Sequence, residues 1–140
     1  MAAGLGRLDG YCRAITEAGF ALSSDLFGHG DFSEESGAAA MRQILSRRPD
    51  VDGIFAASDL MAAGAMRVLK SRGRRIPSDV AVVGFEDSVV ARQTEPPLTT
   101  VHQPVEEMGR EMARLLLDIM RGEGRHSVIL DTHLARRASA

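Results

Sequence analysis

Residues 53–88 alternate a short apolar run, an amphipathic helical pattern and a second apolar run, and this alternation constrains the fold more than any other feature of the chain. The first run, within DGIFAASD, leads directly into LMAAGAMRVLKSRG, where apolar residues recur at helical spacing and Gly73 provides a stop. The second run, Val80 to Phe85, is apolar without alternation, which is typical of strands buried on both faces of a parallel sheet. Strand–helix–strand units with short connections predict an α/β fold with a parallel sheet.

Two helices are expected before this unit. Residues 7–19 carry apolar side chains at helical spacing and end in Gly19, a common helix terminator. Ser33 is a predicted N-cap, because the two glutamates that follow it favour the positive end of a helix dipole. That second helix is expected to run to about Arg47, and a brief strand is expected over 26–29, between the helices.

The pattern changes after Ser88. A polar loop is expected there, and the prolines of EPPLTTVHQP favour an extended path until Pro104, which suits the first turn of a helix. That helix is expected over 105–121 because one broad face is apolar. A last strand is expected over 127–134.

Composition excludes several classes of protein. The chain has 140 residues, of which 44% are hydrophobic and 26% are charged, so it suits one globular domain with a substantial core. A net charge of -2, with both signs spread along the chain, provides no basic surface for nucleic acid. The single cysteine, Cys12, fits a reducing compartment. No apolar run has membrane-spanning length and no secretory signal pattern occurs, so we expect a cytoplasmic location and no membrane partner.

Gly4, Gly6 and Gly10 have a spacing that can accompany a dinucleotide-binding turn. Such a turn needs a strand before it and a helix after it, whereas only three residues precede Gly4. A nucleotide-dependent α/β enzyme is therefore a minor alternative. The four histidines lack the close pairing that metal sites need, and no nucleophile motif occurs. We expect no cofactor, no metal and no catalysis.

Polar side chains follow both central strands, at the edge of a parallel sheet where ligands bind. The candidates are Arg7 at the start of the first helix, Ser58 and Asp59 after the first strand, and Glu86, Asp87 and Ser88 after the second. A guanidinium, hydroxyls and carboxylates together suit a neutral molecule that is rich in hydroxyl groups.

Each candidate also has a simpler interpretation. Ser58 or Asp59 would serve equally well as the N-cap of the following helix. Glu86 and Asp87 would be solvated loop residues. Arg7 would be a surface charge, although the helix dipole disfavours a cation in the first turn, and this favours a specific role.

Five segments in this order, RLDGY, GDFSEESG, IFAASDLMAAGAM, IPSDVAVVGFEDS and PPLTTVHQPVEEMG, resemble the lactose-repressor (LacI) family of bacterial transcription regulators. The resemblance extends over nearly the whole chain. It implies a helix-turn-helix followed by a two-lobed, type I periplasmic-binding-protein-like core, which closes on a small-molecule effector and changes operator affinity. It also implies a homodimer.

The resemblance assigns site residues. GLGRLDGY corresponds to the loop and helix start that carry the family's effector-binding arginine, here Arg7, and Phe32 corresponds to an aromatic platform for the ligand. Ser58 and Glu86 stand where the family usually has Asn and Asp. Serine is shorter and lacks the amide, while glutamate reaches one methylene further, so hydrogen bonds to a sugar are expected to depart from the family's usual pattern.

By the same resemblance the chain is mostly the C-terminal lobe and is incomplete at its N-terminus. We expect 1–95 to form that lobe without its first strand, 96–121 to be a crossover and a helix that returns to the N-terminal lobe, and 122–140 to be the final strand and tail. The helix-turn-helix is absent, so operator DNA would be contacted only by a part outside this chain. A sheet without a central strand leaves backbone groups unpaired, so the isolated chain is expected to fold poorly. A sharp, cooperative unfolding transition of a soluble monomer would contradict this expectation.

The predicted function is therefore effector sensing in a LacI-type regulator, in which binding shifts the population between two lobe arrangements. A pentose, hexose or glycoside is the expected effector, with a nucleobase as the open alternative. A periplasmic sugar-binding protein of a transport system shares the fold and is the alternative function. An upstream signal peptide in place of a helix-turn-helix would indicate the transport protein.

Overall fold

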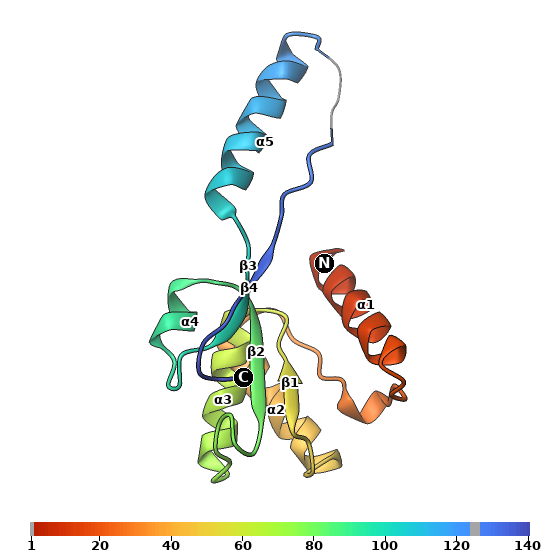
Figure 1. The fold of residues 1–140 in the computed structure, drawn as a ribbon, viewed down its shortest axis with the longest axis vertical. Helices are drawn as coiled ribbons and strands as arrows, with labels where there is room; N and C mark the ends of the chain where they lie inside the picture. The colour runs from red at the N-terminus through yellow and green to blue at the C-terminus, as the bar shows by residue number, and fades with distance from the viewer. Residues whose placement is uncertain (1, 124–126) are drawn as a thin grey trace.

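The computed structural model of the chain describes residues 2–123 and 127–140, which form a four-stranded sheet with helices around it (Figure 1). The strands, in their order across the sheet, are β1 Gly53–Phe55, β2 Ala81–Glu86, β3 Thr99–His102 and β4 His133–Ala135. The first three run parallel, and β4 pairs antiparallel with β3. The parallel sheet predicted from the alternating pattern is therefore confirmed, with one antiparallel edge strand added to it.

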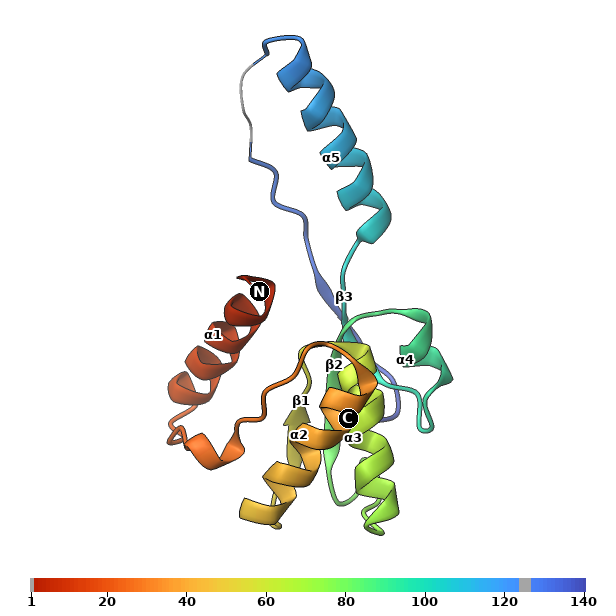
Figure 2. The ribbon, with the colours of Figure 1, turned by 180° about the vertical axis from the view of Figure 1, so that it is seen from behind.

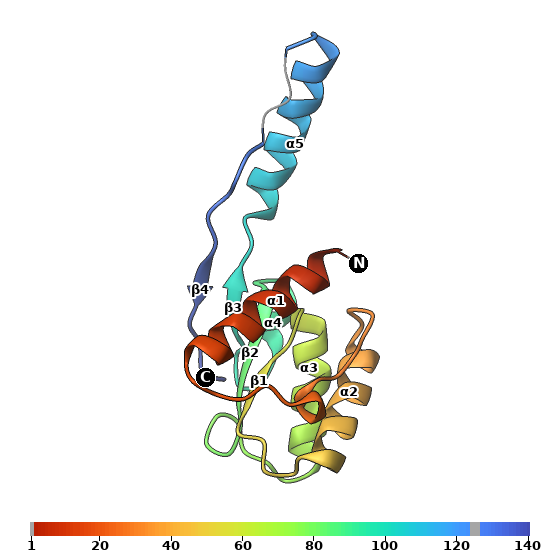
Figure 3. The ribbon, with the colours of Figure 1, turned by 90° about the vertical axis from the view of Figure 1, so that its right-hand side faces the viewer.

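Helices cover one face of the sheet and lie at its two sides. The helices are α1 Ala2–Glu17, the 3-10 helix η1 Ser24–Leu26, α2 Glu34–Arg47, α3 Asp59–Ser71, α4 Val89–Gln93 and α5 Val105–Met120. The pair α2 and α3 packs on one face, whereas α1 lies beside the β1 edge (Figures 1 and 3). Seen from behind, α4 lies on the other side of the sheet from α1 (Figure 2).

The helix α2 begins and ends as its sequence predicts. Ser33 is its N-cap, and the Ser33 hydroxyl accepts a hydrogen bond from the Ser36 amide. Glu34 and Glu35 lie in the first turn, near the positive end of the helix dipole, and each pairs with Arg67 of α3 at 3.0 Å. These ion pairs are exposed to solvent and contribute little to stability.

The helices α2 and α3 approach closely because glycines lie at their contact. A Cβ atom added to Gly64 would lie 2.0 Å from the Glu34 carbonyl oxygen, and one added to Gly37 would lie 2.3 Å from the Met61 carbonyl oxygen. The helices bury a core of small and aliphatic side chains, which includes Ala38, Met41, Ala62, Ala65, Met66, Val68, Leu69, Val80, Val82 and Leu98. Such dense packing holds the ends of the strands in fixed positions.

The first helix starts earlier than predicted. It begins at Ala2 and not at Arg7, so Gly4, Gly6 and Gly10 lie inside a helix. The expectation that GLGR forms a loop before the helix is wrong, since helical backbone continues through the glycines. A Cβ atom added at Gly4 would lie 3.4 Å from the Phe32 ring, an ordinary contact distance, so this helix passes beside Phe32 without requiring glycine there.

Two predicted strands are absent or shorter. No strand forms over 26–29, because a strand needs a neighbour and no described strand pairs with this segment. The strand predicted over 127–134 is reduced to β4, the part that lies beside β3. The polar loop expected after Ser88 contains the five-residue helix α4, and the extended path after the prolines pairs with β2 as β3.

The helix α5 projects from the rest of the structure (Figure 1). None of its residues is buried. Its exposed large apolar side chains are Val105, Met112, Leu116, Leu117, Ile119 and Met120. None of the described helices, α5 included, is long and apolar enough to cross a membrane. An exposed apolar surface of this kind favours contact with another protein surface.

Candidate functional site

A cleft of about 730 Å³ opens between α1, the ends of β1 and β2, and the base of the segment that carries α5. Its lining is mostly apolar and aromatic, with Arg7, Gln103 and Thr132 among its polar members. The lining residues are Gly6, Arg7, Gly10, Tyr11, Phe55, Phe85, Gln103, Pro104, Met108, Val128, Leu130 and Thr132. Clefts of this size with a few polar groups hold small organic ligands.

The Arg7 guanidinium is held in the cleft by several contacts. It donates a hydrogen bond to the Ala57 carbonyl oxygen. Its central carbon lies 3.9 Å from the centre of the Phe85 ring and 5.7 Å from that of Phe32. One of its nitrogens lies 3.6 Å from a carboxylate oxygen of Glu86, and the Arg7 side chain is only 13% exposed. A fork of donors fixed in this way is prepared to bind a ligand that offers oxygen acceptors.

Glu86 is the last residue of β2, and its carboxylate faces Arg7. Burial raises the pKa of Glu86 above its ordinary value; the charge of Arg7 offsets part of this rise, and the charge of Asp59 adds to it. The side chain remains 37% exposed. Glu86 therefore provides a partly desolvated acceptor beside a fixed donor.

Ser58 and Phe32 contact each other through the Phe32 backbone. The Ser58 hydroxyl donates to the Phe32 carbonyl oxygen at 3.3 Å and accepts from the Met61 amide at 3.2 Å. Ser58 is the N-cap of α3 and is 1% exposed. The N-cap interpretation of Ser58 is confirmed, and its contact with a ligand stays a prediction.

The resemblance to the LacI family assigns four site residues, and the structure brings three of them to one place. Arg7, Phe32 and Glu86 meet through the Arg7 side chain. Ser58 reaches this group through the Phe32 carbonyl. Among the described residues that line the cleft, Arg7 is the one member of the predicted set.

Aromatic residues complete the cleft and are not among the predicted site residues. Tyr11 stacks on Phe55, with ring centres 6.1 Å apart and planes 7° apart, and meets Phe27 edge-on at 6.2 Å. Tyr11 lies one helical turn after Arg7, so the two share a helix face, and Phe85 directly precedes Glu86. These two spacings would have allowed the sequence to predict Tyr11 and Phe85 as aromatic residues of the cleft.

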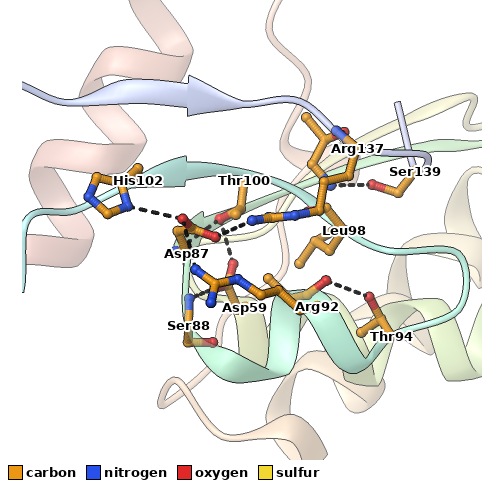
Figure 4. Close-up of polar contacts among 12 residues, drawn as sticks. Asp59, Asp87, Ser88, Arg92, Thr94, Leu98, Thr100, His102, Arg137 and Ser139 are labelled. Atoms are coloured by element: carbon orange, nitrogen blue, oxygen red, sulfur yellow. Dashed lines mark hydrogen bonds and ion pairs between the residues drawn. The ribbon is translucent and has the colours of Figure 1, made fainter.

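Asp59 ties the turn after β2 to β3. It is fully buried. Its carboxylate accepts hydrogen bonds from the Ser88 amide at 2.7 Å and from the Thr100 hydroxyl at 2.6 Å (Figure 4). The N-cap role considered for Asp59 therefore belongs to Ser58.

Asp87 is the centre of a network of two arginines and a histidine (Figure 4). Its carboxylate lies 2.5 Å from Arg137, 3.0 Å from the Nδ1 atom of His102 and 3.7 Å from Arg92. Burial acts to raise the pKa of Asp87, but hydrogen bonds from Arg137 and His102 and the charges of the two arginines outweigh it, so the pKa is lowered. Because the side chain is only 8% exposed, the interpretation of Asp87 as a solvated loop residue is wrong.

Known proteins with similar sequences share this architecture. The family described as periplasmic binding protein-like domain matches residues 3–140. The HTH-type transcriptional regulator CelR of Thermobifida fusca is 55% identical over 141 residues, which cover 99% of this chain and 42% of CelR. The HTH-type transcriptional repressor CytR of Escherichia coli K12 is 38% identical over 95% of this chain and 40% of CytR.

Solved structures show the same fold. A transcriptional regulator CelR–cellobiose complex has a TM-score of 0.96 at 55% identity, and the match covers 100% of this chain and 43% of that chain. The lac repressor dimer bound to operator and the anti-inducer ONPF has a TM-score of 0.86 at 29% identity, with 95% of this chain and 46% of that chain covered.

The open sheet with its cleft at the strand ends defines the class of periplasmic-binding-protein-like domains. Within that class, the chain belongs to the LacI family of transcriptional regulators, as the five segments of its sequence indicate. The chain spans less than half the length of the curated relatives it matches.

Proposed function

We propose that this chain senses a sugar effector as part of a LacI-type transcriptional regulator, and that the effector is cellobiose. The observation that carries the proposal is the pairing of Arg7, which lines the cleft, with the neighbouring Glu86 carboxylate beside the Phe85 ring. A sugar hydroxyl both donates and accepts hydrogen bonds, so a fixed guanidinium and a partly desolvated carboxylate recognise neighbouring hydroxyls together. The Phe85 ring offers an apolar surface to the C–H face of a sugar ring.

The size and wall of the cleft favour a disaccharide. Its volume of about 730 Å³ lies in the upper part of the range for small-molecule sites. The stacked Tyr11 and Phe55 extend the aromatic wall beyond the contacts of Arg7, so a second sugar ring has a surface to pack against. The CelR structure that shares 55% identity with the chain is a complex with cellobiose.

The four predicted site residues receive different roles in this proposal. Arg7 donates to the sugar and Glu86 accepts from it. Phe32 forms an aromatic platform beside Arg7, at 5.7 Å from the guanidinium carbon. Ser58 holds the Phe32 backbone through its hydroxyl, and the remaining lone pair of that hydroxyl is the acceptor for a direct contact with the sugar.

The proposed mechanism is a change in lobe arrangement without a chemical reaction. We assign 1–95 to the C-terminal lobe, 96–121 to the crossover and returning helix, and 122–140 to the final strand and tail, because α5 projects away from the sheet (Figure 1). An effector that prefers one arrangement of the lobes changes operator affinity by its difference in affinity for the two. In this role the protein is a cytoplasmic homodimer. It contacts operator DNA through a helix-turn-helix that lies outside these residues.

A transport role is not favoured. The relatives at 55% and 38% identity are HTH-type transcriptional regulators. A periplasmic sugar-binding protein would share the fold and the cleft, so only the relatives separate the two functions.

Calorimetric titration of the complete gene product that contains these residues tests the proposal. Cellobiose is expected to bind saturably, with one molecule per chain, and NAD is expected to give no heat of binding. Binding of NAD alone would contradict a sugar effector, and binding of neither compound would contradict cellobiose as the effector.

The pH dependence of binding tests the role of Glu86. The ionised carboxylate accepts hydrogen bonds and attracts Arg7, and burial raises its pKa above the ordinary value of 4.5. Affinity for cellobiose is therefore expected to be full near neutral pH and to fall as the pH decreases through the raised pKa, earlier than an exposed glutamate would titrate. Asp87, whose pKa is lowered, stays ionised over that range. Calorimetry between about pH 7 and about pH 4 measures this, and an equal decline in Glu86→Gln would show that another group is responsible.

A further inference from the structure

The turn after β2 carries the proposed sugar-binding carboxylate on strained backbone. Glu86 has φ of 117° and Asp87 has φ of 55°, both in the region that favours glycine. Two consecutive non-glycine residues keep such angles only when surrounding contacts hold them. The position of the Glu86 carboxylate therefore depends on whatever fixes the Asp87 side chain and backbone.

Arg137 fixes the Asp87 side chain. Its Nη2 atom lies 2.5 Å from Asp87 Oδ1, and its Nη1 atom donates to the Leu98 carbonyl oxygen at 2.9 Å (Figure 4). The Asp87 side chain is 8% exposed and that of Arg137 is 19% exposed. An ion pair this shielded from water is screened weakly and is held in one geometry by the second hydrogen bond of the guanidinium.

The segment that carries Arg137 is itself bound to the sheet. The Arg137 amide donates to the Thr99 hydroxyl at 2.9 Å. Two residues later Ser139 is fully buried; its hydroxyl donates to the Val82 carbonyl oxygen at 2.6 Å and accepts from the Thr99 amide at 2.8 Å. The segment that carries Arg137 is thus hydrogen-bonded to both β2 and β3.

We propose that Asp87 and Arg137 are positioning residues for effector binding, a role that rests on the proposed function. Arg137 holds Asp87, Asp87 holds the strained turn, and the turn directs the Glu86 carboxylate towards Arg7 and the sugar. Asp59 secures the other end of the turn through the Ser88 amide. The C-terminal segment therefore contributes to affinity for the sugar without touching it.

A double-mutant cycle on the complete gene product tests this role, with cellobiose as the titrated ligand. Arg137→Gln is expected to raise the Kd about tenfold, within the range for coupled residues, and to have no further effect in a Glu86→Gln background. Arg137→Lys keeps the charge opposite Asp87 and is expected to restore most of the affinity. Arg136→Gln, the same change at the exposed neighbouring arginine, is expected to leave the Kd unchanged.

The outcomes separate the two proposals. An unchanged Kd in Arg137→Gln, or an equal loss in both backgrounds, would show that Arg137 acts on stability alone and would overturn the positioning role. An unchanged Kd in Glu86→Gln would overturn the proposed sugar contact as well. If Arg137→Gln fails to fold in a thermal unfolding scan, Asp87→Asn replaces it in the cycle, with the same expected loss and the same contrary results.

Discussion

Replacement of Arg7 by methionine is expected to weaken cellobiose binding by at least about 100-fold. Hydrogen bonds to charged groups contribute about 1.5–3 kcal/mol each, so the loss of two of them corresponds to a factor of this size. Methionine keeps much of the side-chain volume between Phe85 and Phe32 but leaves Glu86 without its cationic neighbour. Calorimetric titration with cellobiose measures the change.

Two further variants define what Arg7 contributes. Arg7→Lys retains the charge but not the planar fork of donors, so an intermediate loss of about tenfold is expected. Arg13→Met, on the same helix at a side chain that is 73% exposed, is the matched control and is expected to bind normally. Native affinity in Arg7→Met would place the sugar elsewhere and remove the central residue of the proposed site.

Gly64→Ala is expected to destabilise the fold by about 3 kcal/mol or more. The added Cβ atom would lie 2.0 Å from the Glu34 carbonyl oxygen and 2.8 Å from the Ala38 amide nitrogen, both backbone atoms of α2 that no rotamer change can move. The helices α2 and α3 must separate to admit it, and overpacking of this kind costs about 1–3 kcal/mol even where side chains can adjust. Urea-induced unfolding of the complete gene product measures the free energy of unfolding.

The same substitution at Gly10 is the matched control. Gly10 lies in α1, is exposed, and has no atom within 4 Å of an added Cβ. Alanine is favoured over glycine inside a helix by about 0.5–1 kcal/mol, so Gly10→Ala is expected to be neutral or stabilising. A small effect of Gly64→Ala would show that the close approach of α2 and α3 is relaxed in solution.

The parts of the fold that local chemistry specifies were predictable from the sequence. The helix α2 has its N-cap serine and first-turn glutamates within three residues, and β2 is an apolar run that ends in Glu86. The segment 26–29 shows the limit of such patterns, because a strand depends on a partner that local sequence does not reveal. The early start of α1 was missed because Gly4 and Gly6 suggest a turn, whereas helical backbone continues through both.

The site was predictable to a similar degree. Glu86 lies at the carboxyl end of a buried strand and so carries a local signal, whereas the signal at Arg7 rested on a first-turn position that the helix start at Ala2 removes. Asp87 and Arg137 lie 50 residues apart, and nothing near either one predicts their ion pair. The network around the strained turn therefore becomes visible only when the sheet brings the C-terminal segment beside β2.

The crystal structure of the complete gene product with cellobiose tests the central claim most directly. The account predicts one cellobiose in the cleft between α1 and the ends of β1 and β2, with hydroxyl oxygens within hydrogen-bond distance of both Arg7 and Glu86 and one sugar ring against Phe85. Cellobiose bound away from Arg7, or a cleft that stays empty at saturating sugar, would contradict it.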